Sequence, residues 1–295
     1  MDARERTLVS INTYDILGAL GWQDARIFRR WIELAVRFPA RAFAREVISF
    51  DDEVARAGLH DAARGILRRF TDSLAVGGAE RVPARGPVLL VSNHPGMSDT
   101  VALFASVPRA DLRILAADRP FLRSLTAAAR SLIFIPEGPG EAAAAGRSAA
   151  LRAAVSHLRA GGALLTFPAG DIEPDPAVHP GAVASLESWS PSTALLLRRA
   201  PGCVVVPVIV SGVLSPRAQR HPLTLLRRTR KDREWLGSML QIVVRTLLPR
   251  SWPVRVRVDF LDAMSAERLP RGADAALEAL RQPVAAYLRD RFPGS

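Results

Sequence analysis

The stretch VLLVSNHPGMSDT, residues 88–100, decides the fold that this sequence predicts. Its apolar run, residues 88–91, has the length and continuity of a strand that is buried on both faces. The run stops at Ser92, and the Pro-Gly pair followed by Asp99 is typical of a helix N-terminus. We therefore expect His94 and Asp99 together at the carboxyl end of a strand, where open α/β sheets bind their ligands.

Further apolar runs follow this stretch and alternate with helical patterns. Strands are expected at residues 112–116, 132–136, 163–167 and 204–210, and helices at residues 142–160, 191–199 and 273–291. Nearly continuous apolar strands that alternate with helices predict an α/β fold, with a mostly parallel central sheet flanked by helices. Residues 253–260 alternate strictly between apolar and polar side chains, which predicts a half-exposed edge strand.

The predicted organisation has three parts. Residues 1–72 form an N-terminal helical region, in which Pro39 is expected to break the chain into two helices. Residues 73–263 form the α/β domain, which includes a basic helical segment at residues 223–248. Residues 264–295 supply a C-terminal helix.

The composition predicts an acidic partner. The chain has 295 residues, 48% of them hydrophobic, and a net charge of +11. Such a charge favours an anionic membrane surface, nucleic acid or another acidic molecule. Basic and bulky apolar side chains alternate within residues 1–72 and 223–248. Each region fits a helical surface that lies on anionic lipid, and each also fits helices packed on the main domain with a solvated basic face.

Targeting and metal-binding signals are not evident in the sequence. No run of about 18 apolar residues suggests a transmembrane helix, and residues 1–6 carry both charge signs without a following apolar core. We therefore expect a protein of the cytosol or of the cytoplasmic face of a membrane, bound there peripherally or monotopically. No spacing of cysteine, histidine and acidic residues suggests a metal site. The elbow of serine hydrolases and the phosphate loop of nucleotide hydrolases are also lacking.

Four motifs in order make the chain resemble the glycerolipid acyltransferase family, of the 1-acylglycerol-3-phosphate acyltransferase type. They are GAERVP at residues 78–83, Asn-His-x-x-x-x-Asp at residues 93–99, FPAG at residues 167–170 and VPV at residues 206–208. The resemblance implies the fold of that family and transfer of a fatty acyl group to a lysolipid hydroxyl. It also implies acyl-CoA or acyl carrier protein as the co-substrate, and no bound cofactor.

The resemblance assigns the chemistry to His94 and Asp99. A neutral hydroxyl must lose its proton as it attacks a thioester, so His94 is the predicted general base. Asp99 is predicted to fix the tautomer of the imidazole and to stabilise its protonated form. No serine or cysteine nucleophile is required, so no acyl-enzyme is expected. Main-chain N–H groups of the turn at residues 168–171 are candidate donors to the oxyanion.

The chain departs from the family at the positions that hold the acceptor. The second motif of the family, Phe-Ile-x-Arg, ends here in Glu137, and the third motif has Ala169 and Asp171-Ile172 in place of Glu and Thr-Arg. We therefore expect lysophosphatidic acid not to be the best acceptor, unless Arg119, Arg130 or Arg147 replaces the lost cations. The predicted substrate-binding residues are Asn93, Glu137, Phe167, Pro168, Ala169, Gly170 and Asp171.

Other interpretations of the sequence remain. FPAG followed by WSPS at residues 189–192 resembles a branch with acyltransferases for ornithine-type aminolipids, although Trp189 also fits simple core packing at a helix start. Loss of the acceptor motifs fits a catalytically inactive family member that binds lipid or acyl chains at the membrane. Nucleic acid is not an expected partner, because the sequence has no recognisable binding motif for it.

Overall fold

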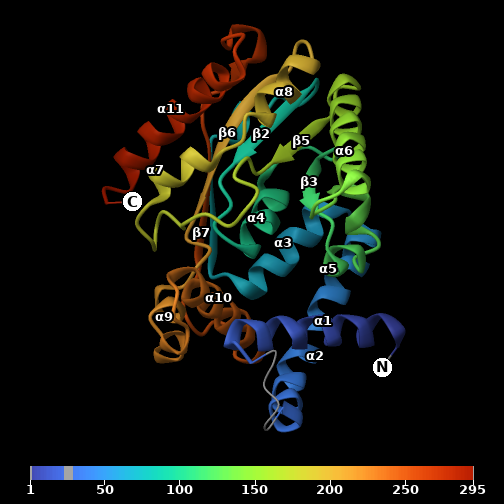
Figure 1. The fold of residues 1–295 in the computed structure, drawn as a ribbon, viewed down its shortest axis with the longest axis vertical. Coiled ribbons are helices and arrows are strands. Elements are labelled where there is room, and N and C mark those ends of the chain that lie inside the picture. Colours follow the sequence, from blue (N-terminus) through green and yellow to red (C-terminus); the bar gives the residue numbers. More distant parts are fainter. Residues whose placement is uncertain (1, 23–28, 295) are drawn as a thin grey trace. The chain divides into compact units, whose positions relative to one another are not determined.

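The computed structural model describes residues 2–22 and 29–294 (Figure 1), so the part of the predicted helical region that falls on residues 23–28 lies outside the described residues. The chain forms two compact units. The sheet unit contains Leu74–Asp118, Arg130–Val213 and Val256–Ser295, and the helical unit contains Met1–Ser73, Arg119–Ala129 and Leu214–Arg255. The domain boundaries predicted after residues 72 and 263 stay predictions.

The sheet unit is built on a mixed sheet, as the apolar runs predict. Within the described residues the sheet has eight strands in the order β1-β7-β6-β2-β5-β3-β4, and β8 pairs with β6. The strands are β1 (Ser73–Gly77), β2 (Val88–Ser92), β3 (Arg113–Ala117), β4 (Leu132–Ile135), β5 (Ala163–Thr166), β6 (Val204–Ser211), β7 (Arg255–Phe260) and β8 (Met264–Ser265). The α/β fold class with a mostly parallel sheet is confirmed.

Strand β2 lies in the middle of the parallel part of the sheet. It pairs in parallel with β5 on one side and with β6 on the other, and β3 pairs in parallel with β5 and β4. Val91 of β2 lies opposite both Thr166 of β5 and Pro207 of β6. The carboxyl ends of these three strands are therefore neighbours at one edge of the sheet.

The prediction that residues 253–260 form an edge strand is wrong. Strand β7 lies between β1 and β6, and it pairs with β6 in the antiparallel sense. Its polar residues are matched to partners: Arg257 Nε donates to Asp259 Oδ2 at 2.7 Å, and Tyr287 Oη donates to the same oxygen at 2.6 Å. The polar alternation therefore comes from paired charged side chains rather than from an open edge.

Three helices share one apolar core with alternate strand residues. They are α6 (Glu141–Arg159), α8 (Ser192–Arg199) and α11 (Ala273–Arg291). The core includes Leu89, Val91, Leu164, Val205 and Ile209 from the strands and Ala154, Leu158, Leu196, Leu197, Leu280 and Val284 from the helices. Strand residues two or four apart point to the same face, so these helices cover one face of the sheet.

The helical unit surrounds a smaller core. Its main helices are α1 (Ala3–Leu20), α2 (Arg29–Ala57), α3 (Leu59–Phe70) and α10 (Arg230–Leu247), with short helices α5 (Pro120–Arg123) and α9 (Pro216–Gln219). Leu8, Val9, Ala44, Val47, Leu125 and Ala128 are buried together. The buried carboxylate of Asp51 accepts hydrogen bonds from the main-chain N–H groups of Ala127 and Ala128, at 3.0 and 2.8 Å, and so ties residues 119–129 to α2.

The predicted break at Pro39 is also wrong, because Pro39 lies inside the continuous helix α2. A proline in a helix interior removes one hydrogen bond and costs about 3 kcal/mol. Tertiary contacts offset this cost. The residues after the proline, Ala40 and Ala44, are fully buried, and the Asn12 side chain of α1 donates to the carbonyl oxygen of Ala40 at 3.2 Å.

None of the described helices is both long enough and apolar enough to cross a bilayer.

Candidate functional site

The site is built where β2 ends and α4 (Met97–Ser106) begins. His94 lies in the short connection, and Asp99 lies in the first turn of α4 with its side chain fully buried. His94 Nδ1 and Asp99 Oδ2 are 2.7 Å apart. Gly96, with φ of 154°, occupies a region of backbone space that glycine alone adopts easily, which lets the chain turn sharply between the two residues.

The Asp99 carboxylate is held from three sides. Its Oδ2 accepts from the main-chain N–H of Gly96 at 2.9 Å as well as from His94, and its Oδ1 accepts from Thr100 Oγ1 at 3.0 Å. The carboxylate thus completes the N-terminus of α4 and orients the imidazole at the same time. With Nδ1 donating to Asp99, the lone pair of the neutral ring lies on Nε2.

Electrostatics favour the protonated form of His94. Burial lowers the pKa of the imidazole, but the charge of Asp99 and its hydrogen bond raise it, and Glu173 and Asp171 raise it further. The net result is a pKa above the ordinary value of 6.5. A ring in this environment takes up a proton more readily than a free imidazole does.

Both polar atoms of the Asn93 side chain form hydrogen bonds with the main chain of β6. Its Nδ2 donates to the carbonyl oxygen of Val210 at 2.9 Å, and its Oδ1 accepts from the N–H of Val210 at 2.8 Å. The side chain is buried, so it continues the pairing of β2 and β6 beyond the end of β2. This pairing positions the adjacent His94, whereas the predicted contact of Asn93 with substrate stays a prediction.

The turn after β5 packs against the histidine. The rings of Phe167 and His94 are stacked, with centroids 4.3 Å apart and an angle of 18° between their planes. Gly170 adopts a φ of 67°, and its N–H donates to the carbonyl oxygen of Phe167 at 3.1 Å. The carbonyl oxygen of Pro168 accepts from the N–H of Ser190 at 3.0 Å. The turn at residues 167–170, including Ala169, therefore lies beside His94, although one of its candidate oxyanion donors is used within the turn.

The two acidic residues expected near the acceptor lie in different places. Asp171 is exposed and close enough to raise the pKa of His94. Glu137 follows β4, which is three strand positions from β2, or about 14 Å at about 4.8 Å for each strand. Arg147 donates to the carbonyl oxygen of Gly138 at 2.9 Å, so it lies at the β4 end of the sheet with Glu137.

Glu173 is a site residue that the sequence interpretation missed. Its side chain is only 5% exposed, and its Oε2 accepts from the main-chain N–H of His94 at 3.0 Å. Its Oε1 accepts from Trp189 Nε1 at 2.9 Å and from Ser185 Oγ at 3.0 Å. Burial raises the pKa of this carboxyl to about 6, against the effect of these hydrogen bonds. An acidic residue between Ile172 and Pro174, directly after the FPAG turn, was the available signal.

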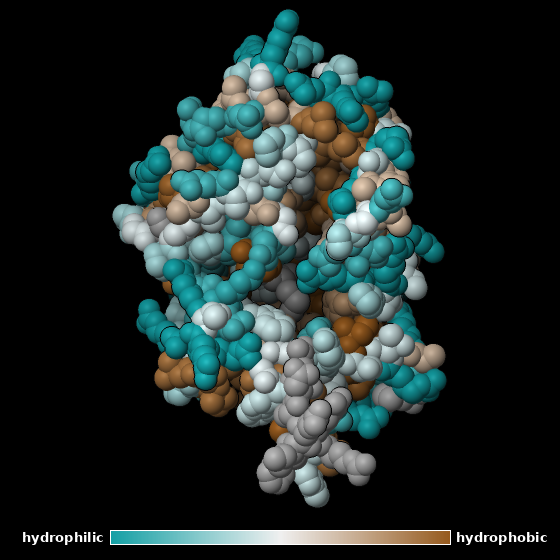
Figure 2. Space-filling model, in the orientation of Figure 1, coloured by the Kyte–Doolittle hydropathy of each residue, from teal (hydrophilic) through white to brown (hydrophobic). Residues whose placement is uncertain are grey.

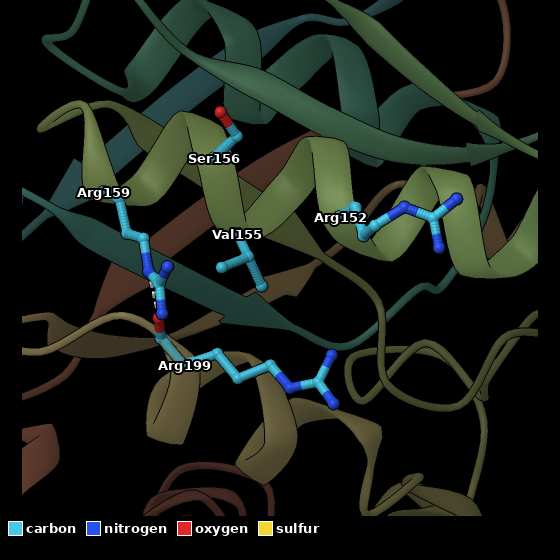
Figure 3. A pocket seen from close by; sticks show the side chains of 5 residues that line it. All are labelled: Arg152, Val155, Ser156, Arg159 and Arg199. Atoms are coloured by element: carbon cyan, nitrogen blue, oxygen red, sulfur yellow. Dashed lines mark hydrogen bonds between the residues drawn. The ribbon is translucent and has the colours of Figure 1, made fainter.

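A cavity of about 370 Å³ lies apart from this site (Figure 3). It is lined by Arg152, Val155, Ser156 and Arg159 of α6 and by Arg199 of α8, and Arg159 Nε donates to the carbonyl oxygen of Arg199 at 2.7 Å. Arg159 and Arg199 end helices α6 and α8, and the chain after them leads into the amino ends of β5 and β6, whereas His94 follows the carboxyl end of β2. In the described residues no group of three or more histidine, cysteine or acidic side chains is placed to hold a metal ion.

Comparison with known proteins finds a matching family and similar solved structures. The family model described as Acyltransferase matches residues 73–211. The crystal structure of the 1-acyl-sn-glycerophosphate (LPA) acyltransferase PlsC from Thermotoga maritima is similar at 16% identity and a TM-score of 0.46, over 98% of this chain and 94% of that chain. The search of curated proteins found no significant match.

Replacing Asp99 by Asn should lower the pKa of His94, because the charge of Asp99 and its hydrogen bond both favour the imidazolium. The measurement is an NMR titration of the imidazole Cε1–H resonances. His157, whose Nε2 lies 2.9 Å from the carbonyl oxygen of Asp111, is the internal control, and its resonance should not be affected by the substitution. An unchanged titration of His94 would show that Asp99 does not control its protonation.

Proposed function

We propose that this protein is an O-acyltransferase that moves a fatty acyl group from an acyl thioester to a hydroxyl of a lysolipid-type acceptor. The match of residues 73–211 to the family model described as Acyltransferase supports this proposal. The observation that carries the proposal is the 2.7 Å contact between His94 Nδ1 and Asp99 Oδ2 within the matched residues. Acyl-CoA and acyl carrier protein are the proposed donors. Both are acidic and complement the net charge of +11.

His94 acts as the general base in this proposal. Nε2 accepts the proton of the acceptor hydroxyl while its oxygen attacks the thioester carbonyl, and Asp99 stabilises the resulting imidazolium. The tetrahedral intermediate then collapses as the carbon–sulfur bond breaks, and the imidazolium returns the proton to the departing thiolate. Since His94 must start neutral, the rate falls as the pH drops through its raised pKa.

The acceptor is proposed not to be lysophosphatidic acid. Asp99, Glu173 and Asp171 all raise the pKa of His94, so the surroundings of the base are negative. A phosphate dianion brought to this place would be repelled, whereas an acceptor with an amine or several hydroxyls would not. Glu137, at the end of β4, lies farther from the base and contributes less to this discrimination.

Replacing His94 by Ala should lower the transfer rate about 10²- to 10⁴-fold, the usual contribution of a general base. Acyl transfer is measured by mass spectrometry with acyl-CoA and acyl carrier protein as donors. His60→Ala, in α3, is the control and should keep full activity. If the wild type transfers from no donor, the protein is instead a catalytically inactive member that binds lipid or acyl chains.

The acceptor preference is tested with lysophosphatidic acid, a lyso-aminolipid and a polyol lipid at equal concentration. We expect the lowest kcat/KM for lysophosphatidic acid, and Asp171→Asn should raise that value relative to the other acceptors because it removes one negative charge near the base. A clear preference of the wild type for lysophosphatidic acid would contradict the proposed role of the acidic residues.

The helical unit is the proposed membrane-binding part. Most of the exposed large apolar side chains belong to it: Tyr14, Trp22, Trp31, Leu34, Phe38, Leu223, Leu225, Leu226, Trp235, Leu247 and Leu248. On α2 the side chains of Trp31 and Phe38 are 72% and 70% exposed and lie on one face, with Arg41 and Arg45 one and two turns farther along. Figure 2 shows hydrophobic atoms at the surface of the segment that carries α9 and α10, with hydrophilic side chains beside them. Apolar side chains flanked by arginines fit the cytoplasmic face of an anionic membrane.

The double variant Trp31→Ser with Phe38→Ser should weaken binding to phosphatidylglycerol-containing vesicles at least tenfold, since each large side chain contributes about 1.5–3 kcal/mol when buried. Vesicle co-sedimentation measures the binding, and added salt should weaken the wild type as well. Val76→Ser, on β1 of the sheet unit, is the control. Tighter binding to duplex or single-stranded nucleic acid than to these vesicles would favour a nucleic-acid-binding protein.

A further inference from the structure

A second carboxylate contacts the histidine from a loop that the resemblance does not explain. We propose that Glu173 is a positioning residue for the His94 base, which holds the main chain of His94 and supplies a second negative charge beside its imidazole. The inference rests on the proposed acyl transfer and adds a residue to its machinery.

Glu173 engages both main-chain polar groups of His94. Its N–H donates to the carbonyl oxygen of His94 at 2.8 Å, and its Oε2 accepts from the N–H of His94 at 3.0 Å. The ring of the histidine is held separately, by Asp99 at Nδ1 and by the stacked ring of Phe167. The backbone and the ring of the base are thus fixed by different elements, so loss of Glu173 would move the backbone while the Asp99 contact remains.

The loop that carries Glu173 is tied to the ends of three parallel strands. Glu173 binds His94 beyond β2, the carbonyl oxygen of Pro168 beyond β5 accepts from Ser190, and Asp175 Oδ1 accepts from the N–H of Gly212 beyond β6 at 2.8 Å. Such a tethered loop holds its carboxylate in one place. Precise placement of this kind is what a general base requires, because small displacements of reacting groups lower rates strongly.

The hydrogen-bond donors around Glu173 indicate that its negative charge acts on His94. The donors to its two oxygens are neutral groups: an indole, a hydroxyl and a main-chain amide. A buried carboxylate that has only neutral donors is costly for stability. Because both of its oxygens accept from donors, a glutamine in this place would turn its NH2 group towards one of them, so the carboxylate serves the hydrogen bonds as well as the interaction of its charge with the imidazolium of His94.

The charged groups that face His94 set the direction of the pH effect. Asp99 comes from α4, and Asp171 and Glu173 come from the loop after β5; all three raise the pKa of the imidazole. Glu173 carries this charge above its own pKa of about 6, and removing the charge there lowers the pKa of His94. The base then stays neutral to lower pH, so the acidic limb of the rate profile moves to lower pH even though the maximal rate falls.

The test compares Glu173→Gln with wild type and with Glu278→Gln, an exposed position of α11 that serves as the matched control. We expect Glu173→Gln to lower kcat about tenfold or more. KM for the acyl donor should stay within about twofold, and the acidic limb should move to lower pH. NMR should show the pKa of His94 lowered in Glu173→Gln and unchanged in Glu278→Gln. An unchanged His94 pKa and acidic limb in a folded Glu173→Gln protein would overturn the proposal and leave Glu173 a purely structural residue.

Two further measurements distinguish failure of the Glu173 proposal from failure of the proposed acyl transfer and from misfolding of the variant. The NMR titration needs no substrate, so it decides the role of Glu173 even if the wild type transfers no acyl group and the proposed function fails. Circular dichroism establishes whether Glu173→Gln is folded. If it is not, Ser185→Ala removes one donor to Oε1 and keeps the carboxylate. It should lower kcat severalfold, and wild-type kcat and pH profile in Ser185→Ala would then overturn the proposal.

Discussion

The parallel pairing of β2 with both β5 and β6 is the constraint on which the site depends. Because Val91 lies opposite Thr166 and Pro207, the three strands end within a few residues of one another at the same edge of the sheet. The chain beyond each strand then supplies one part of the site. His94 follows β2, Phe167 follows β5, and Gly212 beyond β6 anchors the loop that carries Glu173. A change in strand order would separate these parts, whatever their individual conformations.

The N-terminus of α4 is the second feature that positions the side chains of the site. Asp99 accepts from the main chain of Gly96 and from the imidazole of His94 through the same oxygen, so helix geometry and ring orientation depend on one carboxylate. Glu173 and Asp171 also act on the imidazole, since each of them raises the pKa of His94. In a chain with a net charge of +11, the vicinity of the base is thus acidic.

The local features of the fold and site could be predicted from the sequence, and the long-range ones could not. Buried runs identify the parallel strands, and the spacing of His94 and Asp99 lets both residues lie at one strand–helix connection. Glu173 was missed because its partners are 79, 16 and 12 residues away, and periodicity carries no information about such contacts. The errors at Pro39 and at β7 have the same cause, since packing against α1 and pairing with β1 override the local signal.

The tethered loop has a consequence for how the protein folds. Its anchors lie beyond β2, β5 and β6, and the register of these strands joins Val91 to Thr166 and to Pro207 across large separations in the chain. Contacts of this kind form late, because long segments of chain must be ordered before they are gained. The loop therefore closes on His94 only after the central strands have paired. The local pairing of Asp99 with His94 spans only five residues, whereas the complete site requires the whole central sheet.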